Sequence, residues 1–326
     1  MAGRTVTIPL EIKSVYSISP MGAVMMYTLA PSKITGLVYM PDDEEKALLL
    51  NAFVKKPVLG GLFGKNTTAN PEVIIKAHPD FVLSVGNLEK TDISGAERIH
   101  EQLGIPVVMV NGNLKLIDSA YRFLGGLIGE VDRADTLARY CRAVLNQTDS
   151  IVAAIPSEKK VRIYYAEGLD GLQTDSKGSM HTEILDRAGG INVADIPLLQ
   201  GYGRSAVSFE QLLVWQPAII IVCLDHGYAH GTENFARITS DPSWHMITAV
   251  KNGSVYQIPS LPFNWIDRPP SVNRIIGLRW LTNLLYPDYC KIAIRDETRR
   301  FYALFYRRKL SDEELNHVLM NAVRKP

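Results

Sequence analysis

The sequence predicts an α/β protein whose two halves each contain a parallel sheet and are joined by one long helix. Short apolar strands alternate with helices on both sides of residues 132–156. Within that stretch, apolar residues recur every three or four positions, the period of one helix face, and neither Gly nor Pro interrupts them before Pro156. A helix of about 24 residues is roughly 36 Å long. The alternative is a long surface helix within a single domain.

The first half alternates strands with helices. Runs rich in β-branched and apolar residues predict strands at 4–10, 13–18, 33–38, 81–85 and 105–110. Helices are expected at 22–30, 42–54, 70–78, 94–103 and 114–129. Asn70 is a favourable N-cap, and Pro71 suits the first helical position. This alternation favours a parallel sheet covered by helices on both faces.

The second half repeats the pattern. Strands are expected at 160–166, 218–224 and 255–258. Helices are expected at 180–188, 208–215, 232–240, 243–248 and 273–285, and the tail from 288 to 322 is helical. The predicted division is therefore an N-terminal lobe at 1–131, a connecting helix at 132–156 and a C-terminal lobe at 157–326.

Composition excludes several classes of protein. The chain has 326 residues, of which 46% are hydrophobic and 21% charged, values typical of a folded globular protein. Its net charge of +1 provides no overall field that would favour nucleic acid or an anionic membrane. The three cysteines, Cys141, Cys223 and Cys290, are far apart and lack zinc-site spacing. The first ten residues lack the apolar segment of a signal peptide.

No motif in the sequence indicates catalysis. It contains no HExxH, no GxSxG, no phosphate-loop signature and no GxGxxG after a strand. His226 and His230 are four residues apart, but Gly227 and Gly231 disfavour the helix that would direct both toward one metal ion. We therefore expect no catalytic residues, no cofactor and no enzymatic activity, and the sequence leaves any metal ligands unknown.

Polar and aromatic residues gather in the loops that follow predicted strands. In open α/β sheets, ligands bind beyond the carboxyl ends of the strands. Arginine offers planar, bidentate contacts to carboxylates and oxyanions, and aromatic rings suit flat or apolar ligand parts. The candidate ligand-binding residues are Tyr165, Tyr202, Arg204, His226, Tyr228, Trp265 and Arg268.

Arg204 and Arg268 are predicted to face each other and grip an anionic ligand. Arg204 follows Gly-Tyr-Gly, and Arg268 precedes Pro269, which is expected to hold the Arg268 backbone extended. Pre-ordering of this kind reduces the entropy lost on binding. The alternative is that Asp267 neutralises Arg268 as a structural pair while Arg204 is solvated.

Two segments share one pattern, NPEVIIKAHPDFVLSV and SFEQLLVWQPAIIIVC. Each has a capping residue, a Glu near the helix start, a Pro and a buried strand, and Glu72 and Glu210 occupy the same place in each. A Glu in the first helical turn complements the helix dipole, which would explain either residue alone.

Three further segments belong with these two: GIPVVMV, YYAEGLDGLQTDSKGSMHTEILDRAGGINVA and SDPSWHMITAVKNGSVYQIP. In all five segments the chain resembles class III substrate-binding proteins of ABC importers. The resemblance covers nearly the whole chain. These proteins are receptors for iron–siderophores, haem, cobalamin and some metal oxyanions. The resemblance implies two Rossmann-like lobes joined by one long helix, with the ligand in a cleft between them. It also implies that Glu72 and Glu210 dock onto arginines of the permease.

The function implied is capture of a ferric siderophore or similar metal chelate and its delivery to an ABC permease with its ATPase. The basic and aromatic segment 261–271 favours an acidic metal chelate. Molybdate or tungstate, a nickel chelate, haem and cobalamin are alternative ligands. A nitrogenase-like two-lobed enzyme or a sensory module are alternatives of another class. We expect a monomer that binds no nucleic acid and is periplasmic, or extracellular and lipid-anchored.

Overall fold

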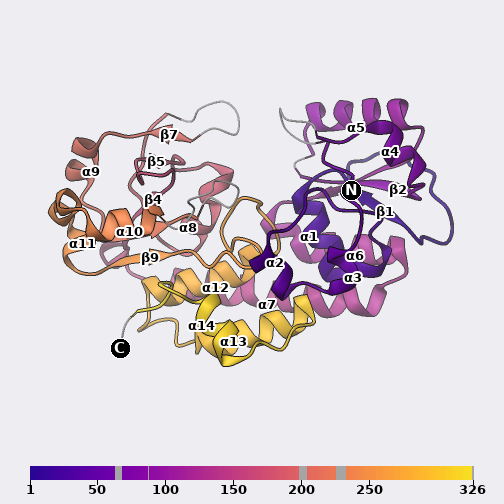
Figure 1. Ribbon diagram of the computed structural model, residues 1–326. Helices are drawn as coiled ribbons and strands as arrows, with labels where there is room; N and C mark the ends of the chain where they lie inside the picture. The colour runs from indigo at the N-terminus through magenta and orange to yellow at the C-terminus, as the bar shows by residue number, and fades with distance from the viewer. Residues whose placement is uncertain (63–67, 87, 198–203, 225–232, 325–326) are drawn as a thin grey trace. The chain divides into compact units, whose positions relative to one another are not determined.

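The computed structural model describes residues 1–62, 68–86, 88–197, 204–224 and 233–324 (Figure 1). Contacts divide the chain into two compact units. The first unit is Met1–Leu145 with Arg299–Lys309, and the second is Asn146–Thr298 with Leu310–Pro326. The mixed α/β class and the parallel sheets predicted from the sequence are confirmed. Among the helices that are described, none is both long and apolar enough to span a bilayer.

The long helix is present as predicted. α7 (Val131–Ala153) is continuous over 23 residues. Leu137, Cys141 and Val144 are fully buried, whereas Arg139 is exposed. The chain enters α7 in the first unit and leaves it in the second. Periodicity alone therefore identified this long helix, which crosses from the first unit into the second.

The first unit is built on a three-stranded parallel sheet. The strands β1 (Val15–Ser17), β2 (Phe81–Gly86) and β3 (Val107–Asn111) lie in that order. The helices α4 (Pro71–Lys76) and α5 (Lys90–Leu103) cover one face. The other face is covered by α1 (Pro20–Leu29) and α6 (Ile117–Ile128), which lie below the strands in Figure 1. The two short helices α2 (Asp43–Leu48) and α3 (Asn51–Val54) complete this part of the chain.

Two strands predicted in this half are absent from the described structure. Residues 4–10 form no strand, and residues 33–38 contribute only single bridges, Val15 with Ile34 and Leu37 with Val58. A β-branched sequence forms a strand only where a neighbouring strand supplies hydrogen-bond partners and packing. Residues 33–38 meet their neighbours only at these single bridges, and residues 4–10 are not paired with any described strand, so propensity alone does not produce a strand in either segment.

The second unit is built on a four-stranded parallel sheet in the order β6-β4-β8-β9. The two long predicted strands are β4 (Arg162–Ala166) and β8 (Ile219–Val222), and β9 (Val255–Gln257) and the two-residue β6 (Ile191–Asn192) flank them. Ile163 pairs with Ile219, and Ile220 pairs with Val255. A separate antiparallel ribbon, β5 (Gln173–Thr174) with β7 (Ser205–Ala206), extends from this sheet.

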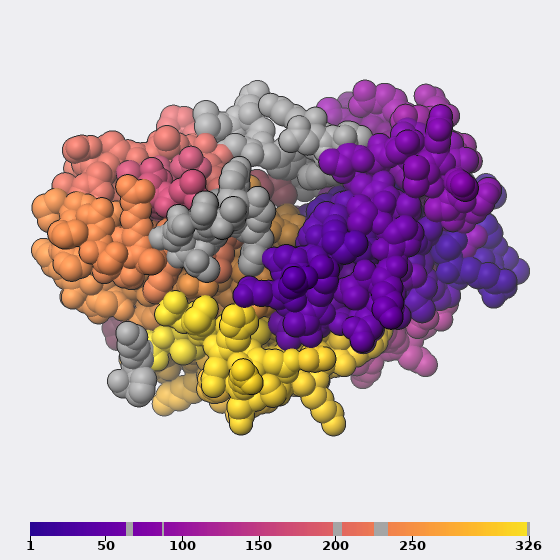
Figure 2. Space-filling model, viewed as in Figure 1, coloured from indigo at the N-terminus to yellow at the C-terminus, as the bar shows by residue number. Residues whose placement is uncertain are grey.

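One face of this sheet packs against four short helical segments. They are α9 (Phe209–Trp215), α10 (Glu233–Ser240), the 3-10 helix Pro242–Met246 and α11 (Thr248–Lys251). Tyr164, Ile220 and Val222 of the sheet meet Ile238 and Trp244 in one buried cluster. Figure 2 shows α10 and α11 in orange as a continuous surface. The short α8 (Glu183–Arg187) contacts both β6 and α12 (Asn273–Leu285).

The C-terminal part of the chain returns to the first unit. After α13 (Ile294–Phe301) comes a π-helical turn, Tyr302–Tyr306, and residues 299–309 belong to the first unit. Phe305 stacks on Phe301 with ring centroids 4.4 Å apart. The guanidinium of Arg307 donates to the carbonyl oxygens of Tyr27, Thr28 and Leu29 at the end of α1. The predicted lobe at 157–326 did not include this return, after which α14 (Asp312–Val318) lies in the second unit.

Glu45 gives the first unit a testable pH dependence. Burial raises the pKa of its carboxyl from 4.5 to about 7, while the N–H of Asp42, which donates to this carboxyl at 2.9 Å, opposes the shift. A raised acid pKa stabilises the folded state below the unfolded pKa, and this contribution is lost as pH rises through the folded pKa. As pH rises from about 4.5 to 7, the free energy of unfolding of the wild type should fall by up to about 3 kcal/mol relative to that of Glu45→Gln.

Urea unfolding of both proteins across this pH range measures the difference. Glu44→Gln alters an exposed neighbour and serves as the control. Parallel stability curves for the wild type and Glu45→Gln would show that the buried carboxyl titrates normally.

Candidate functional site

The candidate site lies at the carboxyl edge of the second unit's sheet. Because β4, β8 and β9 are parallel, the residues that follow them meet at this edge. Glu167 directly follows β4, Cys223 directly follows β8, and a loop at 258–272 follows β9. Glu167 and Cys223 are fully buried. The amide nitrogen of Asn234 ties these ends together by donating to the carbonyl oxygens of Cys223 at 2.8 Å and Gly168 at 3.3 Å.

The loop after β9 is held rigidly by its own polar groups. The side-chain oxygen of Asn264 accepts hydrogen bonds from the N–H groups of Ile266 at 2.8 Å and Asp267 at 3.0 Å. The amide of Asn273, on α12, donates to the carbonyl of Phe263 at 2.7 Å. Residues 258–267 are buried throughout. This loop therefore presents Asp267 and Arg268 from a fixed backbone.

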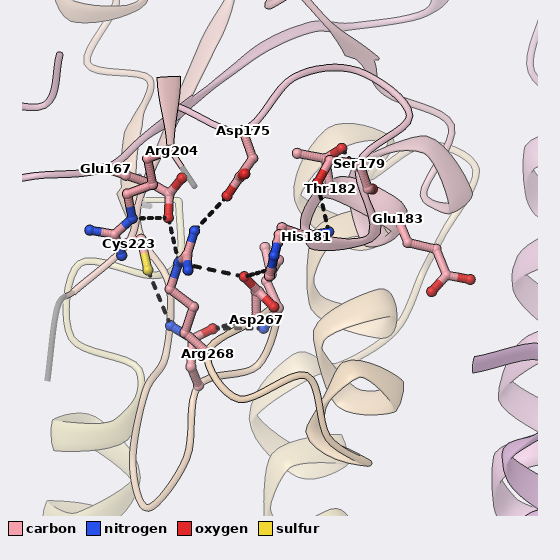
Figure 3. A network of polar contacts seen from close by, with 12 residues as sticks. Glu167, Asp175, Ser179, His181, Thr182, Glu183, Arg204, Cys223, Asp267 and Arg268 are labelled. Atoms are coloured by element: carbon pink, nitrogen blue, oxygen red, sulfur yellow. Dashed lines mark hydrogen bonds and ion pairs between the residues drawn. The ribbon is translucent and has the colours of Figure 1, made fainter. Parts of the chain in front are cut away.

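Two arginines converge on one buried carboxylate (Figure 3). The Nε atoms of Arg268 and Arg204 lie 2.8 Å and 2.9 Å from Oε1 of Glu167. Arg268 also donates to Oδ2 of Asp175 at 2.7 Å, and its Nε lies 3.6 Å from Oδ2 of Asp267. Burial raises the pKa of Glu167, whereas the charges of the two guanidinium groups oppose that shift. The two arginines thus lie together on Glu167, and their grip on an anionic ligand stays a prediction.

The small ribbon explains how residues distant in sequence join this cluster. Thr174 pairs with Ser205, so the next residues outward, Asp175 and Arg204, lie at the same end of the ribbon. The side chain of Asn192 fixes Asp175 by donating to its carbonyl at 3.1 Å. The ribbon therefore delivers one carboxylate and one guanidinium to the edge of the sheet.

The predicted backbone of Arg268 is wrong. Pro269 was expected to hold Arg268 extended, but its φ is +57°, in the left-handed region, and the Arg268–Pro269 peptide bond is cis. A non-glycine residue keeps a left-handed conformation where its surroundings determine it more strongly than its own preference. Here the ion pairs with Glu167 and Asp175 fix the side chain.

His181 adds an imidazole to the cluster. Its Nδ1 lies 2.6 Å from Oδ2 of Asp267, and both side chains are buried. Burial opposes the charged form of His181, but the hydrogen bond and charge of Asp267, with the charge of Asp175, outweigh it and raise the pKa. The hydroxyl of Ser179 accepts from the His181 N–H at 3.2 Å and fixes the start of this turn. Sequence reasoning missed the roles of Asp175 and His181.

Tyr165 and Trp265 occupy packed positions. Tyr165 is fully buried on β4, and its hydroxyl has no hydrogen-bond partner among the residues that the structure describes. Trp265 is also fully buried and meets Trp280 edge to face, with ring centroids 6.5 Å apart. The environment of Trp265 is therefore that of a core residue that supports the loop.

Three predicted ligand-binding residues, Tyr202, His226 and Tyr228, lie outside the described residues, as does His230. The two predicted docking residues are described. Glu72 on α4 and Glu210 on α9 are both exposed, each in the first turn of a helix. Hydrogen bonds from the backbone at the helix start and from Ser208 lower the pKa of Glu210.

Two compact α/β units, each built on a parallel sheet, define the class of this fold. Residues 39–262 match the periplasmic binding protein family, and the chain belongs to this family. A solved ABC transporter solute-binding protein from Sulfurospirillum deleyianum DSM 6946 is 31% identical, with a TM-score of 0.88 over 97% of both chains. The family resemblance read from the sequence is confirmed.

More distant relatives have different ligands in their names. A molybdate-binding protein, MolA, of Haemophilus influenzae is 28% identical over 154 residues, which are 47% of this chain and 41% of that protein. A vitamin B12-binding protein of Salmonella typhimurium is 28% identical over 226 residues, 66% of this chain and 73% of that protein. A solved structure of a periplasmic solute-binding protein from Veillonella parvula shares the fold, with 23% identity, a TM-score of 0.79 and coverage of 99% and 96%.

Gly277 tests how tightly the loop after β9 is seated on α12. A Cβ atom at Gly277 would lie 1.9 Å from the carbonyl oxygen of Trp265, closer than such atoms approach. Gly277→Ala must displace the loop and should destabilise the protein by about 1–3 kcal/mol, the range for overpacking. Gly126, inside α6, has open space where its Cβ would be, so Gly126→Ala should stabilise by roughly 0.5–1 kcal/mol. Chemical denaturation measures both, and equal stabilities would contradict the seating of the loop.

Proposed function

We propose that the protein is the receptor of an ABC importer that captures a ferric siderophore or similar anionic metal chelate and delivers it to the permease with its ATPase. Family membership makes it a periplasmic binding protein. The 31% identical relative over 97% of both chains is described as a solute-binding protein of an ABC transporter. The finer assignment of the ligand rests on the arginine pair.

The arginine pair is the single observation that carries the choice of an anionic ligand. The carboxylate of Glu167 is fully buried, whereas the side chains of Arg268 and Arg204 are 25% and 15% exposed. Glu167 thus fixes two guanidinium groups from the buried side, and each arginine side chain stays partly exposed to solvent. A guanidinium has five N–H donors, and the ion pairs of Arg268 with Glu167 and Asp175 engage its Nε and one Nη. An oxyanion or a carboxylate-bearing chelate fits this pair.

An oxyanion such as molybdate is the second candidate ligand, favoured by the Haemophilus influenzae relative, whose name gives molybdate as its ligand. A nickel chelate, haem and cobalamin stay as further alternatives. The nitrogenase-like alternative would need cysteines for a metal cluster. Cys141, Cys223 and Cys290 are each buried and far apart in the sequence, which does not suit that role.

Glu72 and Glu210 are proposed as the docking residues for permease arginines. Both are exposed, and Val73 beside Glu72 and Val214 on α9 are also exposed, to 43% and 77%. A carboxylate beside exposed apolar side chains is suited to a partner that supplies a cation and an apolar surface. We further propose that the protein acts as a monomer in the periplasm, or outside the cell on a lipid anchor.

Removal of Arg268 should weaken binding of an anionic ligand. Arg268→Ala should raise Kd about 10- to 100-fold, as expected from about 1.5–3 kcal/mol for a hydrogen bond to a charged group. Arg268→Lys keeps the charge but loses the planar arrangement of donors, so its Kd should lie between those of the wild type and Arg268→Ala. Trp265→Phe should cost less than Arg268→Ala. Titration with a ferric siderophore and with molybdate measures these values.

Arg237→Ala, which changes an exposed residue of α10, is the matched control, and melting curves establish that each variant folds. Wild-type affinity in both Arg204→Ala and Arg268→Ala would refute the anion clamp. Absence of binding by the wild type to either ligand would refute these two assignments while leaving the family unchanged.

Charge reversal at the docking residues should separate transport from ligand binding. Glu72→Arg or Glu210→Arg should leave ligand affinity unchanged, because each is an exposed residue in the first turn of its helix. Uptake by cells that carry the cognate permease should fall, because like charges facing across an interface cost several kcal/mol. Glu101→Arg on the exposed side of α5 is the control. Full uptake by both reversed variants would remove these residues from the docking surface.

A further inference from the structure

We propose that Asp175, His181 and Asp267 form a binding site for one first-row transition-metal dication, bound directly by the protein. One ligand atom from each residue lies within 4.8 Å of the other two. The closest pair is Nδ1 of His181 and Oδ2 of Asp267, 2.6 Å apart (Figure 3). The proposal does not depend on which cargo the receptor carries.

Burial distinguishes this group from an ordinary surface cluster of acids. Asp175, His181 and Asp267 are 3%, 7% and 1% exposed. Buried carboxylates require a compensating cation because removal from water is costly for a charge. The described cluster brings the carboxylates of Glu167, Asp175 and Asp267 together with the guanidinium groups of Arg204 and Arg268, and the buried Arg274 acts on Asp267 through its charge.

Unused polar atoms supply a second, independent observation. Oδ1 of Asp267 and the hydroxyl of Tyr165 are buried and have no hydrogen-bond partner among the described residues. Burial raises the pKa of Tyr165, and the charges of Cys223, Glu167 and Asp267 act in the same direction. Native proteins rarely leave such groups unpaired. A metal ion with a bound water provides partners for both atoms.

Neighbouring groups hold the three ligands in position. Arg268 fixes Oδ2 of Asp175 at 2.7 Å. The N–H of Asp267 is bound by Asn264, and Ser179 caps the turn that carries His181. Outer contacts of this kind orient metal ligands and are part of most metal sites.

The donor set selects the class of ion. One imidazole nitrogen with two carboxylate oxygens suits Zn²⁺, Mn²⁺, Fe²⁺, Co²⁺ or Ni²⁺ better than Ca²⁺ or Mg²⁺, which favour oxygen ligands alone. With bonds of about 2.0–2.2 Å, adjacent ligands of one ion lie roughly 3 Å apart. His181 and Asp267 are near this spacing, and a rotation of the Asp175 carboxylate closes the remaining distance. The ion replaces the proton shared by His181 and Asp267.

Titration of chelator-treated full-length protein with Zn²⁺, Mn²⁺ and Co²⁺ alone tests the site. We expect one equivalent to bind, a rise in melting temperature, and a visible absorption spectrum with Co²⁺. His181→Gln, Asp267→Asn and the isosteric Asp175→Asn should each weaken binding more than about 10-fold, since even outer contacts contribute 10- to 100-fold. His100→Gln, at an exposed position of α5, should bind as the wild type does.

Circular dichroism identifies any variant that fails to fold, and one folded variant of the three suffices. Failure of the wild type to bind any of the three ions would overturn the proposal. So would unchanged binding in a folded variant, or loss of binding in a His226→Gln/His230→Gln double variant together with retention in His181→Gln. A parallel titration with molybdate separates the outcomes, because a wild type that binds molybdate but none of the three metal ions refutes this site without touching the proposed transport function.

Discussion

The carboxylate of Glu167 is the charge on which the edge of the second sheet depends. It is fully buried, and a buried charge without partners costs several kcal/mol. Arg204 arrives from the ribbon and Arg268 from the loop after β9, so this one side chain ties three separate segments together. The left-handed backbone of Arg268 follows from the same requirement, since the guanidinium must reach both Glu167 and Asp175.

The ion pairs of Glu167 both stabilise the fold and prepare the two arginines to bind an anion. A carboxylate beneath two arginines holds them close despite their mutual repulsion, and it reduces the freedom they would lose on meeting a ligand. Arg268 and Arg204 are partly exposed, whereas Glu167 is fully buried. The guanidinium groups are therefore accessible to an anion, and the carboxylate is not. A dication held by Asp175, His181 and Asp267 would add positive charge beside the two arginines, which would strengthen an anion site there.

Sequence reasoning succeeded where structure is encoded locally. The apolar period of α7, the buried run of β8 and the Asn70 cap of α4 were all readable, because each depends on neighbours within a few residues. The strand expected at 4–10 was wrong because strand formation needs a partner elsewhere in the chain.

The site was predictable only in part, for the same reason. Arg204 and Arg268 stand out because they lie in loops shaped by Gly and Pro after strands. Asp175 and His181 have no local signal, since their partners are 93 and 86 residues away. Their roles depend on a two-residue ribbon and a 3-10 turn, elements too short to produce a periodic pattern.

The return of residues 299–309 to the first unit has a consequence for how the chain acquires its structure during synthesis. The last carbonyls of α1 accept hydrogen bonds from Arg307, which the ribosome adds about 280 residues after Tyr27. A nascent chain that ends before this point has the three strands of the first sheet and most of their helices. It lacks the aromatic residues Phe301 and Phe305 and the guanidinium that covers the end of α1. Completion of the N-terminal unit must therefore wait for almost the last part of the chain to leave the ribosome.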